Sequence, residues 1–366
     1  MPDPQDRPDP RELLRELRAR ERALKPDRGR GGAGSAGGAP PEGRAPHGPP
    51  ALVDAQGRRI SYLRLSVTDR CNYRCVYCSP SETPRADLTR AQIRRLLSAF
   101  AGLGVRRVRL TGGEPLWRKD IVELASDAAA TPGVEEVCLS TNGTNLAALA
   151  APLRAAGVRK VNVSIDSLDP ARFAALTRGG RVAEVVAGIE AALAAGFPEV
   201  AVNAVVLRGA NEADAAPLVR WAWAHGLTPR FIELMPFAGG APVPVDEIVA
   251  RLARDGVALG PELPRPQGRG PASYRRGEGG EVGFIGALSH NFCASCNRLR
   301  VSTRGELQAC LGGSERVPLA PLLEDGVPAP LLESTIRAAL ARKEEGHRFL
   351  EPKVGGRLLS MMGIGG

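Results

Sequence analysis

The chain has 366 residues and carries 49 Lys and Arg against 40 Asp and Glu, which gives a formal net charge of +9 at pH 7. This length is enough to bury a sizeable core in one large domain or two ordinary ones. No run of about eighteen apolar residues occurs, so a membrane span is not expected, and the polar N-terminus lacks the apolar stretch of a secretion signal. We therefore expect a cytoplasmic protein whose seven cysteines stay reduced and can bind metal.

Residues 1–57 differ in composition from the rest of the chain. Residues 11–24 (RELLRELRARERAL) have the pattern of a short charged helix, and a tract rich in Gly, Pro and Ala follows. Such a tract buries too little apolar surface to offset the entropy lost on ordering. We predict a disordered extension with one short helix, and we favour this over a partner-binding role.

From residue 58 to residue 237, apolar runs typical of buried parallel strands alternate with helical patterns. The predicted strands are Leu63–Val67, Val105–Leu110, Val134–Leu139, Val158–Ile165, Val200–Leu207 and Pro229–Leu234. The predicted helices are Arg90–Leu103, Asp120–Ala130, Leu146–Ala155, Val182–Ala195 and Ala213–His225. The alternation predicts a parallel α/β fold, either an open doubly wound sheet or an incomplete barrel. In both, functional residues gather at the carboxyl ends of the strands.

The alternation stops near Phe237, and we predict a C-terminal subdomain over residues 238–366. Its elements are a hairpin strand at Glu281–Ile285, a cysteine cluster and a helix near Leu331–Glu344, before a terminal Gly365-Gly366.

Three cysteines, Cys71, Cys75 and Cys78, are spaced C-x3-C-x2-C directly after the first predicted strand. Their soft thiolates select iron–sulfur clusters or zinc. A structural zinc site is closed by a fourth ligand, and no Cys or His follows nearby. The incomplete set favours an iron–sulfur cluster with one iron open to another molecule, with a zinc loop as the alternative.

A second set, Cys293, Cys296 and Cys310, is spaced C-x2-C-x13-C. Zinc remains an alternative here because His290 could supply a fourth ligand. Arg298 and Arg300 alternate along an extended segment, so both can project to the same side. Paired guanidinium groups suit phosphates, whereas two solvated surface arginines would be the plainer interpretation.

Polar motifs end several of the predicted strands: TGGEP (Thr111–Pro115), STNG (Ser140–Gly143), NVSIDS (Asn162–Ser167) and RFIELMP (Arg230–Pro236). The TGGEP glycines allow close approach of the backbone to a ligand. Three other residues are predicted to be structural: Cys138 as a core side chain, His225 as a helix-end residue and Asp169 as a helix cap before Pro170. Asp166 could orient a ligand, but we do not include it among the predicted site residues.

The first cysteine spacing, with Tyr77 before the last cysteine, resembles the radical S-adenosylmethionine (SAM) superfamily. Together with the second spacing, the NRLR segment and the terminal Gly-Gly, it resembles the GTP 3′,8-cyclase family of molybdenum cofactor biosynthesis over about residues 60–366. The resemblance implies an incomplete parallel (β/α)6 TIM-like barrel over residues 58–237, followed by a subdomain carrying a second cluster. It also implies two [4Fe–4S] clusters and SAM as cofactors, and GTP as the substrate.

The resemblance further implies a role for each matching residue. Cys71, Cys75 and Cys78 would hold the SAM-cleaving cluster, and Cys293, Cys296 and Cys310 a second cluster that binds the guanine base. SAM contacts are implied for Tyr77, Gly113, Ser164 and Met235, and GTP contacts for Arg64, Arg109, Ser140, Arg230, Arg298 and Arg300. The tail with Gly365 and Gly366 would reach into the active site, where Arg298 and Arg300 serve catalysis. The implied lyase reaction abstracts hydrogen from ribose C3′ and joins C3′ to guanine C8.

One departure concerns Ala201, where the family has a lysine. Losing a phosphate contact could cost about 1.5–3 kcal/mol unless another cation replaces it. Two alternatives therefore stay open: a two-cluster radical SAM paralogue with another substrate, and a non-catalytic, zinc-bound, basic RNA-binding protein. The favoured interpretation implies no nucleic acid but a homodimer, an electron donor such as a flavodoxin or ferredoxin, and delivery of the product to the next enzyme of the molybdopterin pathway.

Overall fold

The computed structural model describes residues 51–78, 87–236, 240–264, 270–347 and 349. The predicted helix at 11–24 and the terminal Gly365-Gly366 lie outside the described residues. The predicted disordered extension reached residue 57, but Leu52–Val53 (β1) and Arg59–Ile60 (β2) form an antiparallel hairpin. This part of the prediction was wrong because Leu52 is buried and the buried Asp54 carboxylate accepts hydrogen bonds from Gln56 N and Arg58 N across the turn.

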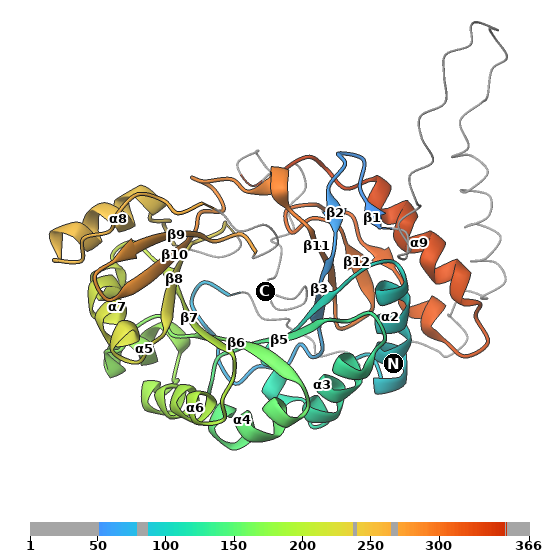
Figure 1. Cartoon of the computed structure of the whole chain (residues 1–366), viewed down its shortest axis with the longest axis horizontal. Helices are drawn as coiled ribbons and strands as arrows, with labels where there is room; N and C mark the ends of the chain where they lie inside the picture. The colour runs from blue at the N-terminus through green and yellow to red at the C-terminus, as the bar shows by residue number, and fades with distance from the viewer. Residues whose placement is uncertain (1–50, 79–86, 237–239, 265–269, 348, 350–366) are drawn as a thin grey trace, which may run out of the picture. The chain divides into compact units, whose positions relative to one another are not determined.

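One large sheet organises the molecule (Figure 1). Its strands are β3 (Tyr62–Ser66), β4 (Arg107–Thr111), β5 (Glu136–Thr141), β6 (Val158–Ser164), β7 (Glu199–Val206), β8 (Thr228–Glu233), β9 (Ser273–Gly277), β10 (Gly280–Ile285), β11 (Arg298–Val301), β12 (Glu306–Gln308) and β13 (Val317–Pro318). They pair in the order β13-β12-β11-β3-β4-β5-β6-β7-β8-β10-β9. The described strands curve into an arc whose two edge strands do not pair with each other, so the barrel is incomplete.

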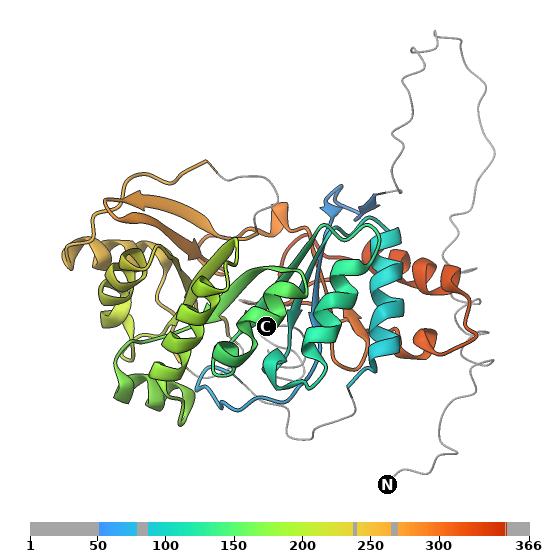
Figure 2. The ribbon, with the colours of Figure 1, turned by 60° about the horizontal axis from the view of Figure 1, so that its bottom comes forward.

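Helices cover the outer side of the arc, as Figures 1 and 2 show. The α-helices are α2 (Arg90–Gly102), α3 (Ile121–Ala130), α4 (Leu146–Ala155), α5 (Pro170–Thr177), α6 (Val182–Ala194), α7 (Ala215–Ala224), α8 (Val245–Arg254) and α9 (Ala329–Ala341). Short 3-10 turns lie at η2 (Pro115–Trp117), η3 (Glu212–Asp214), η4 (Cys293–Ser295) and η5 (Ala320–Leu323). The start of α2 illustrates the local signals, because Thr89 and Gln92 form a reciprocal capping box.

Side-chain alternation along each strand separates the core from the interior of the arc. In β3, Leu63 and Leu65 are fully buried in the hydrophobic core, whereas Arg64 between them lines the interior cavity. The same alternation places Val161 and Val163 of β6 in the core and Asn162 in the cavity. Apolar residues therefore hold the helices on the outside, and the polar residues are left to line the inside.

The parallel α/β fold predicted from the sequence is confirmed, and of its two forms the structure adopts the incomplete barrel. The six predicted strands correspond to β3–β8, although β4 and β5 begin two residues late, because Val105 and Val134 close the turns after the preceding helices. The helices α5 and α8 were not predicted. The hairpin strand expected at Glu281–Ile285 is β10, paired antiparallel with β9.

The predicted subdomain over residues 238–366 contributes strands to both edges of the main sheet. β10 pairs in parallel with β8, and β11 pairs in parallel with β3. The boundary at residue 237 stays a prediction. What the topology establishes is that the second cysteine set, which flanks β11 and β12, lies beside the first strand of the barrel.

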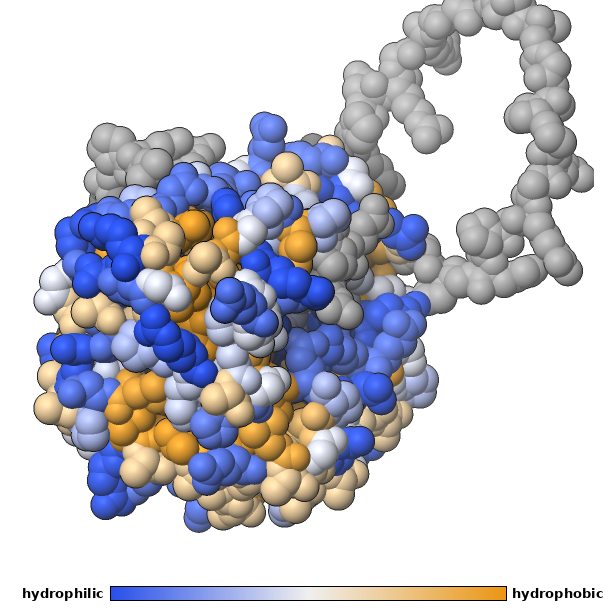
Figure 3. All heavy atoms as spheres, turned by 60° about the vertical axis from the view of Figure 1, so that its left-hand side comes forward, coloured by the Kyte–Doolittle hydropathy of each residue, from blue (hydrophilic) through white to orange (hydrophobic). Residues whose placement is uncertain are grey.

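The outer surface mixes polar and apolar residues, which are interspersed on the face turned forward in Figure 3. Among the described residues, the large apolar side chains with substantial exposure are Val53, Trp117 and Leu193. None of the helices in the described part of the chain is both long and apolar enough to cross a membrane.

Candidate functional site

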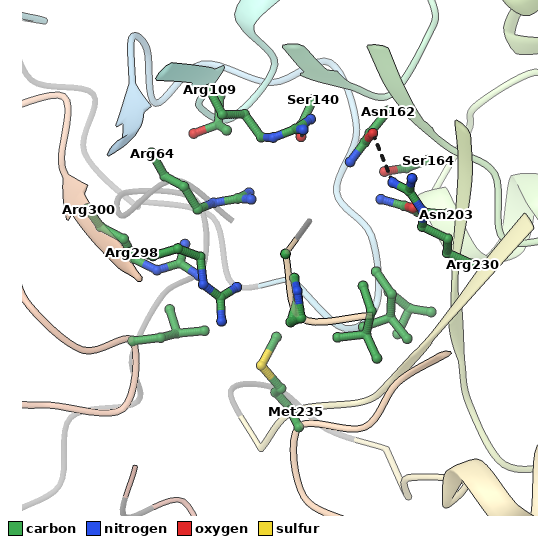
Figure 4. Close-up of a pocket in the computed structure, with 18 of the residues that line it drawn as sticks. Arg64, Arg109, Ser140, Asn162, Ser164, Asn203, Arg230, Met235, Arg298 and Arg300 are labelled. Atoms are coloured by element: carbon green, nitrogen blue, oxygen red, sulfur yellow. Dashed lines mark hydrogen bonds between the residues drawn. The ribbon is translucent and has the colours of Figure 1, made fainter. Parts of the chain in front are cut away.

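A cavity of about 380 Å³ lies on the inner side of the sheet. Figure 4 shows Arg64, Arg298 and Arg300 on one side of it, Arg109 and Ser140 next to them, and Asn162, Ser164, Asn203 and Arg230 on the opposite side. Every predicted site residue that the structure describes lines this cavity: Arg64, Cys71, Cys75, Tyr77, Cys78, Arg109, Gly113, Ser140, Ser164, Arg230, Met235, Cys293, Cys296, Arg298, Arg300 and Cys310. Residues far apart in the sequence are thus brought to one place. Gly365 and Gly366 lie outside the described residues.

Three arginines form a row across neighbouring strands of the cavity wall. Arg300 of β11 is in register with Arg64 of β3, which is in register with Arg109 of β4. Like charges directly opposite each other destabilise a sheet. Burial and the nearby Arg109 and Arg298 lower the pKa of Arg64 to about 10, and burial with Arg64 and Arg298 holds the pKa of Arg300 well below its ordinary value. A bound polyanion would relieve this repulsion.

Arg109 of this row and the nearby Arg298 are each held by neutral groups. Arg109 donates to the Leu139 carbonyl oxygen at 2.9 Å, to the Ser140 hydroxyl at 3.3 Å and to the Tyr62 hydroxyl. The guanidinium of Arg298 lies over the ring of Phe292, 4.9 Å from its centre. These partners orient the guanidinium groups of Arg109 and Arg298, which suit planar, bidentate recognition of phosphate.

A second row of charged residues, in which the signs alternate, crosses the sheet from β4 to β8. Arg107 pairs with Glu136, Glu136 with Lys160 at 3.1 Å, Lys160 with Glu199 at 2.8 Å, and Glu199 with Arg230 at 2.8 Å. Although burial alone would raise the pKa of Glu199, its hydrogen bond from Lys160 and the charge of Arg230 lower that pKa to about 2. Arg107, Lys160 and Glu199 were not predicted as site residues, because charged residues near strand starts carry no motif.

Some polar atoms of the cavity wall are left without a partner. Among the described residues, the buried side-chain oxygen of Asn203 has no hydrogen-bond partner, and neither has the buried Nε of Arg230. Arg230 otherwise donates to the Asn162 side-chain oxygen at 3.3 Å, the bond drawn in Figure 4. A ligand with a donor near the Asn203 oxygen and an acceptor near the Arg230 Nε would satisfy both atoms.

The loop with the first cysteine set is fixed against the TGGEP motif. Gly113 N donates to Thr68 O and Glu114 N to Arg70 O, each at 2.7 Å. A Cβ added at Gly112 would lie 2.5 Å from Thr68 O, and one at Gly113 would lie 2.4 Å from Arg70 O. The close approach that the sequence assigned to a ligand is therefore made here by the backbone of the cysteine loop.

Polar residues surround the sulfur atoms of this loop. Cys71 Sγ accepts from Tyr73 N at 3.4 Å and from Asn142 Nδ2 at 3.9 Å, which brings the STNG motif to the first cysteine. Tyr77 donates its hydroxyl hydrogen to Asp166 at 2.5 Å, and Asp166 also accepts from Val205 N. Asp166 is thus a tether between strand ends β6 and β7 and the cysteine loop.

The electrostatics of the loop favour a cationic centre. Burial raises the pKa of Cys71, and burial together with the Cys71 charge raises the pKa of Cys78 to about 12. Burial, Asp166 and the other two cysteines also raise the pKa of Cys75. Thiolates are the form that binds metal, so these three require positive charge among them, which the irons of a cluster provide. The donor set fits a [4Fe–4S] cluster with one iron left open.

The second cysteine set lies in a more cationic setting. Although burial alone would raise it, the charges of Arg298 and Lys343 lower the pKa of Cys296 to about 7. Lys343 Nζ lies 3.8 Å from Cys296 Sγ. Within the described ranges, no group of three or more His, Cys, Asp and Glu side chains is arranged to hold a single metal ion. An iron–sulfur cluster does not need its cysteines to converge on a single ion, because each cysteine binds its own iron atom.

Residues predicted to be structural are found in such positions. Cys138 is fully buried, Asp169 caps α5 by accepting from Arg172 N, and His225 ends α7. His290, the candidate fourth zinc ligand, pairs instead with Asp246 of α8 at 3.3 Å.

Comparisons with known proteins show the family to which the chain belongs. The model of the radical SAM superfamily matches residues 65–222, and the model described as molybdenum cofactor synthesis C matches residues 227–349. Among solved structures, Streptococcus suis SuiB bound to S-adenosylmethionine has a TM-score of 0.56 at 14% identity, covering 80% of this chain and 74% of SuiB. That likeness shows that the two chains share a fold.

Curated relatives are similar over most of their length. A GTP 3′,8-cyclase of Pseudomonas entomophila is 43% identical, covering 85% of this chain and 96% of the relative. GTP 3′,8-cyclase 1 of Pseudomonas aeruginosa is 45% identical, covering 81% and 94%. A GTP 3′,8-cyclase of Heliobacterium modesticaldum is 42% identical, covering 86% and 100%. The chain therefore belongs to the GTP 3′,8-cyclase family of the radical SAM superfamily.

Proposed function

We propose that this chain is a lyase that converts GTP to (8S)-3′,8-cyclo-7,8-dihydroguanosine 5′-triphosphate, the reaction of molybdopterin biosynthesis that gives its relatives their name. The observation that carries the proposal is the single cavity into which both cysteine sets and the arginine row open. A radical generator and a polyanion site in one enclosed space can act on the same molecule.

Cys71, Cys75 and Cys78 would hold the first [4Fe–4S] cluster, which when bound supplies the electron that cleaves SAM. Tyr77, Gly113, Ser164 and Met235 surround the adjoining space and would contact SAM. The role of this chain's own residues is to orient that molecule. Asp166 fixes Tyr77, while the backbone of the cysteine loop is held by Gly113 N.

Cys293, Cys296 and Cys310 would hold a second [4Fe–4S] cluster whose open iron binds the guanine base. The triphosphate would then lie against the arginines of the cavity wall, where Arg64, Arg109, Arg298, Arg300 and Arg230 supply guanidinium groups and Ser140 a hydroxyl. A triphosphate carries roughly three to four negative charges at neutral pH, and each phosphate favours bidentate guanidinium contacts. This need accounts for the basic cavity without any nucleic acid.

Lys160 offers an answer to the absence of a lysine at position 201. Ala201 is fully buried in β7, on the same face of the strand as Glu199 and Asn203, which both line the cavity. Its partner in register on β6 is Asn162, and Lys160 lies two residues before Asn162 and also lines the cavity. Lys160 pairs with Glu136 and Glu199 in this structure, and we propose that its ammonium turns to the triphosphate when GTP binds and so replaces the missing cation.

The test is anaerobic reconstitution with iron and sulfide, followed by incubation with SAM, a reductant and GTP. We expect about eight irons per chain, four in each cluster, and formation of 5′-deoxyadenosine that depends on GTP. SAM cleavage that GTP does not affect would contradict the cyclase and favour a paralogue with another substrate. A colourless preparation that contains zinc would favour the non-catalytic RNA-binding alternative.

The remaining partners stay proposals that follow from family membership. They are a homodimer, a reduced flavodoxin or ferredoxin as the electron donor, and the next enzyme of the pathway as the recipient of the product. The cytoplasmic location expected from the sequence also stays a prediction, as does the catalytic role of Gly365 and Gly366.

A further inference from the structure

A buried lysine lies beside the second cysteine set, in a part of the chain that no motif pointed to. Lys343 lies two residues after the end of α9, and it is only 3% exposed. Lysine is almost never this deeply buried unless its charge is paired and its donors are satisfied. Its contacts therefore indicate what it does.

The ammonium of Lys343 contacts both stretches that carry the second cysteine set. On one stretch it approaches Cys296 Sγ at 3.8 Å and donates to Arg298 O at 3.3 Å. On the other it donates to the carbonyl oxygen of Ala309, the residue before Cys310. A single side chain thus ties the Cys296 stretch to the Cys310 stretch, across the antiparallel pair β11 and β12.

The segment that follows Lys343 is anchored to the same cysteines. A Cβ added at Gly346 would lie 3.9 Å from Cys293 Cβ. Arg58, from the N-terminal hairpin, donates to the carbonyl oxygens of Cys293 at 2.9 Å, Glu345 at 2.8 Å and Glu344 at 2.7 Å. Because residues 344–347 are fixed in this way, the position of Lys343 does not depend on its own contacts alone.

We propose that Lys343 is a positioning residue for the second iron–sulfur cluster. It holds the two cysteine stretches at a fixed separation, and it donates an N–H to the thiolate of Cys296. A cation and a hydrogen bond at a cluster sulfur favour the more negative, reduced form of the cluster, so Lys343 shifts its reduction potential upward. This inference rests on the second cluster of the proposed function.

The experiment isolates the second cluster in the full chain. The variant Cys71→Ala/Cys75→Ala/Cys78→Ala removes the ligands of the first cluster, so that all bound iron reports on Cys293, Cys296 and Cys310. In this background, Lys343→Met removes charge and donor, whereas Lys343→Gln removes the charge but keeps N–H donors. Lys119→Met, at an exposed lysine, is the matched control. The two readouts are iron retained against a chelator and the midpoint potential from an EPR-monitored redox titration.

We expect Lys343→Met to lose iron to the chelator at a concentration roughly 10-fold lower, as for other residues that support metal ligands. Its midpoint should shift to a more negative potential, with Lys343→Gln shifted in the same direction and Lys119→Met unchanged. If Lys343→Met does not fold, we compare the iron retention and midpoint potential of Lys343→Gln with those of Lys119→Met. A difference between these two variants would support the role of Lys343.

Two results would overturn the inference, and they are distinguishable. If the triple cysteine variant binds iron but its retention and midpoint do not respond to either Lys343 substitution, the inference fails while the second cluster stands. If the triple variant binds no iron at all, the second cluster of the proposed function fails, and the inference fails with it.

Discussion

Arg300 of β11 lies directly opposite Arg64 of β3 in a parallel strand pair, although the two residues come from opposite ends of the chain. Neighbouring cations on the same face of a sheet repel each other, and here both line the wall of one cavity. The folded chain bears this cost at the place where an anionic substrate would offset it. Under the proposed function, the pair would link the stability of the unliganded protein to the binding of GTP.

Arg300→Met tests this relationship. Removing the guanidinium takes one contact from the triphosphate, so the Kd for GTP should rise about 10-fold or more, equivalent to about 1.4 kcal/mol. In the same variant, relief of the repulsion with Arg64 should leave the melting temperature of the unliganded protein unchanged or raised. GTP binding by calorimetry and thermal unfolding measure the two effects. Arg337→Met, at an exposed arginine of α9, is the control. Equal GTP affinity in both variants would contradict the assignment.

Lys160→Met and Ala201→Lys together test whether Lys160 replaces the missing cation. Lys160→Met should raise the KM for GTP by about 5- to 10-fold, because one charge-assisted phosphate contact is lost. Ala201→Lys should change the KM of the parent little, but should restore it in the Lys160→Met background. The KM for GTP is measured by steady-state kinetics for the parent, the two single variants and the double variant. If Ala201→Lys lowers the KM of the parent markedly, a phosphate contact is missing in the natural chain and Lys160 does not supply it.

The bond between Tyr77 and Asp166 should couple the first cysteine loop to the end of β6. Tyr77→Phe removes one donor from the buried Asp166, which keeps that of Val205 N, so the free energy of unfolding should fall by about 1–3 kcal/mol. The double variant with Asp166→Asn should lose less than the sum of the single losses. A double-mutant cycle on chemical unfolding, together with SAM affinity, measures the coupling. Strictly additive losses would show that the bond does not act as a tether.

Glu114 should make the stability of the iron-free protein depend on pH. Burial raises the pKa of this carboxyl from 4.5 to about 7, even though it accepts hydrogen bonds from Asn142 N, Thr141 and Leu116 N. Since the pKa of the folded state lies above that of the unfolded state, the stabilising contribution is fully present below about pH 4.5 and is lost as the pH rises through about 7.

The free energy of unfolding of the parent, relative to Glu114→Gln, should therefore fall across this range, by at most about 1.4 kcal/mol per pH unit. Urea unfolding at a series of pH values compares the two proteins. An amide at this position cannot serve every donor, so the variant will be less stable throughout, and the pH dependence of the difference is the quantity of interest. Parallel curves for the two proteins would show that Glu114 is ionised in the folded chain over the whole range.

The sequence by itself determined the two sets of cysteine ligands and the class of fold. Cys71, Cys75 and Cys78 fall within one loop, so their spacing limits where they can lie. The alternation of strands and helices predicts a parallel sheet, because apolar residues recur with a different period in buried strands than in the helices that cover them. For the same reason Arg298 and Arg300 could be assigned to one side of an extended segment. These are local relationships, and local geometry is what a sequence pattern encodes.

The tertiary structure decided which distant residues share a cavity. The pairing of β11 with β3 places Arg300 beside Arg64, the strand register brings Lys160 within reach of the space beside Ala201, and the end of α9 delivers Lys343 to Cys296. None of these contacts leaves a periodic signal, because each depends on the order in which strands join the sheet. Strand order is set by the packing of the whole core, and that is a property of the folded chain rather than of any segment in it.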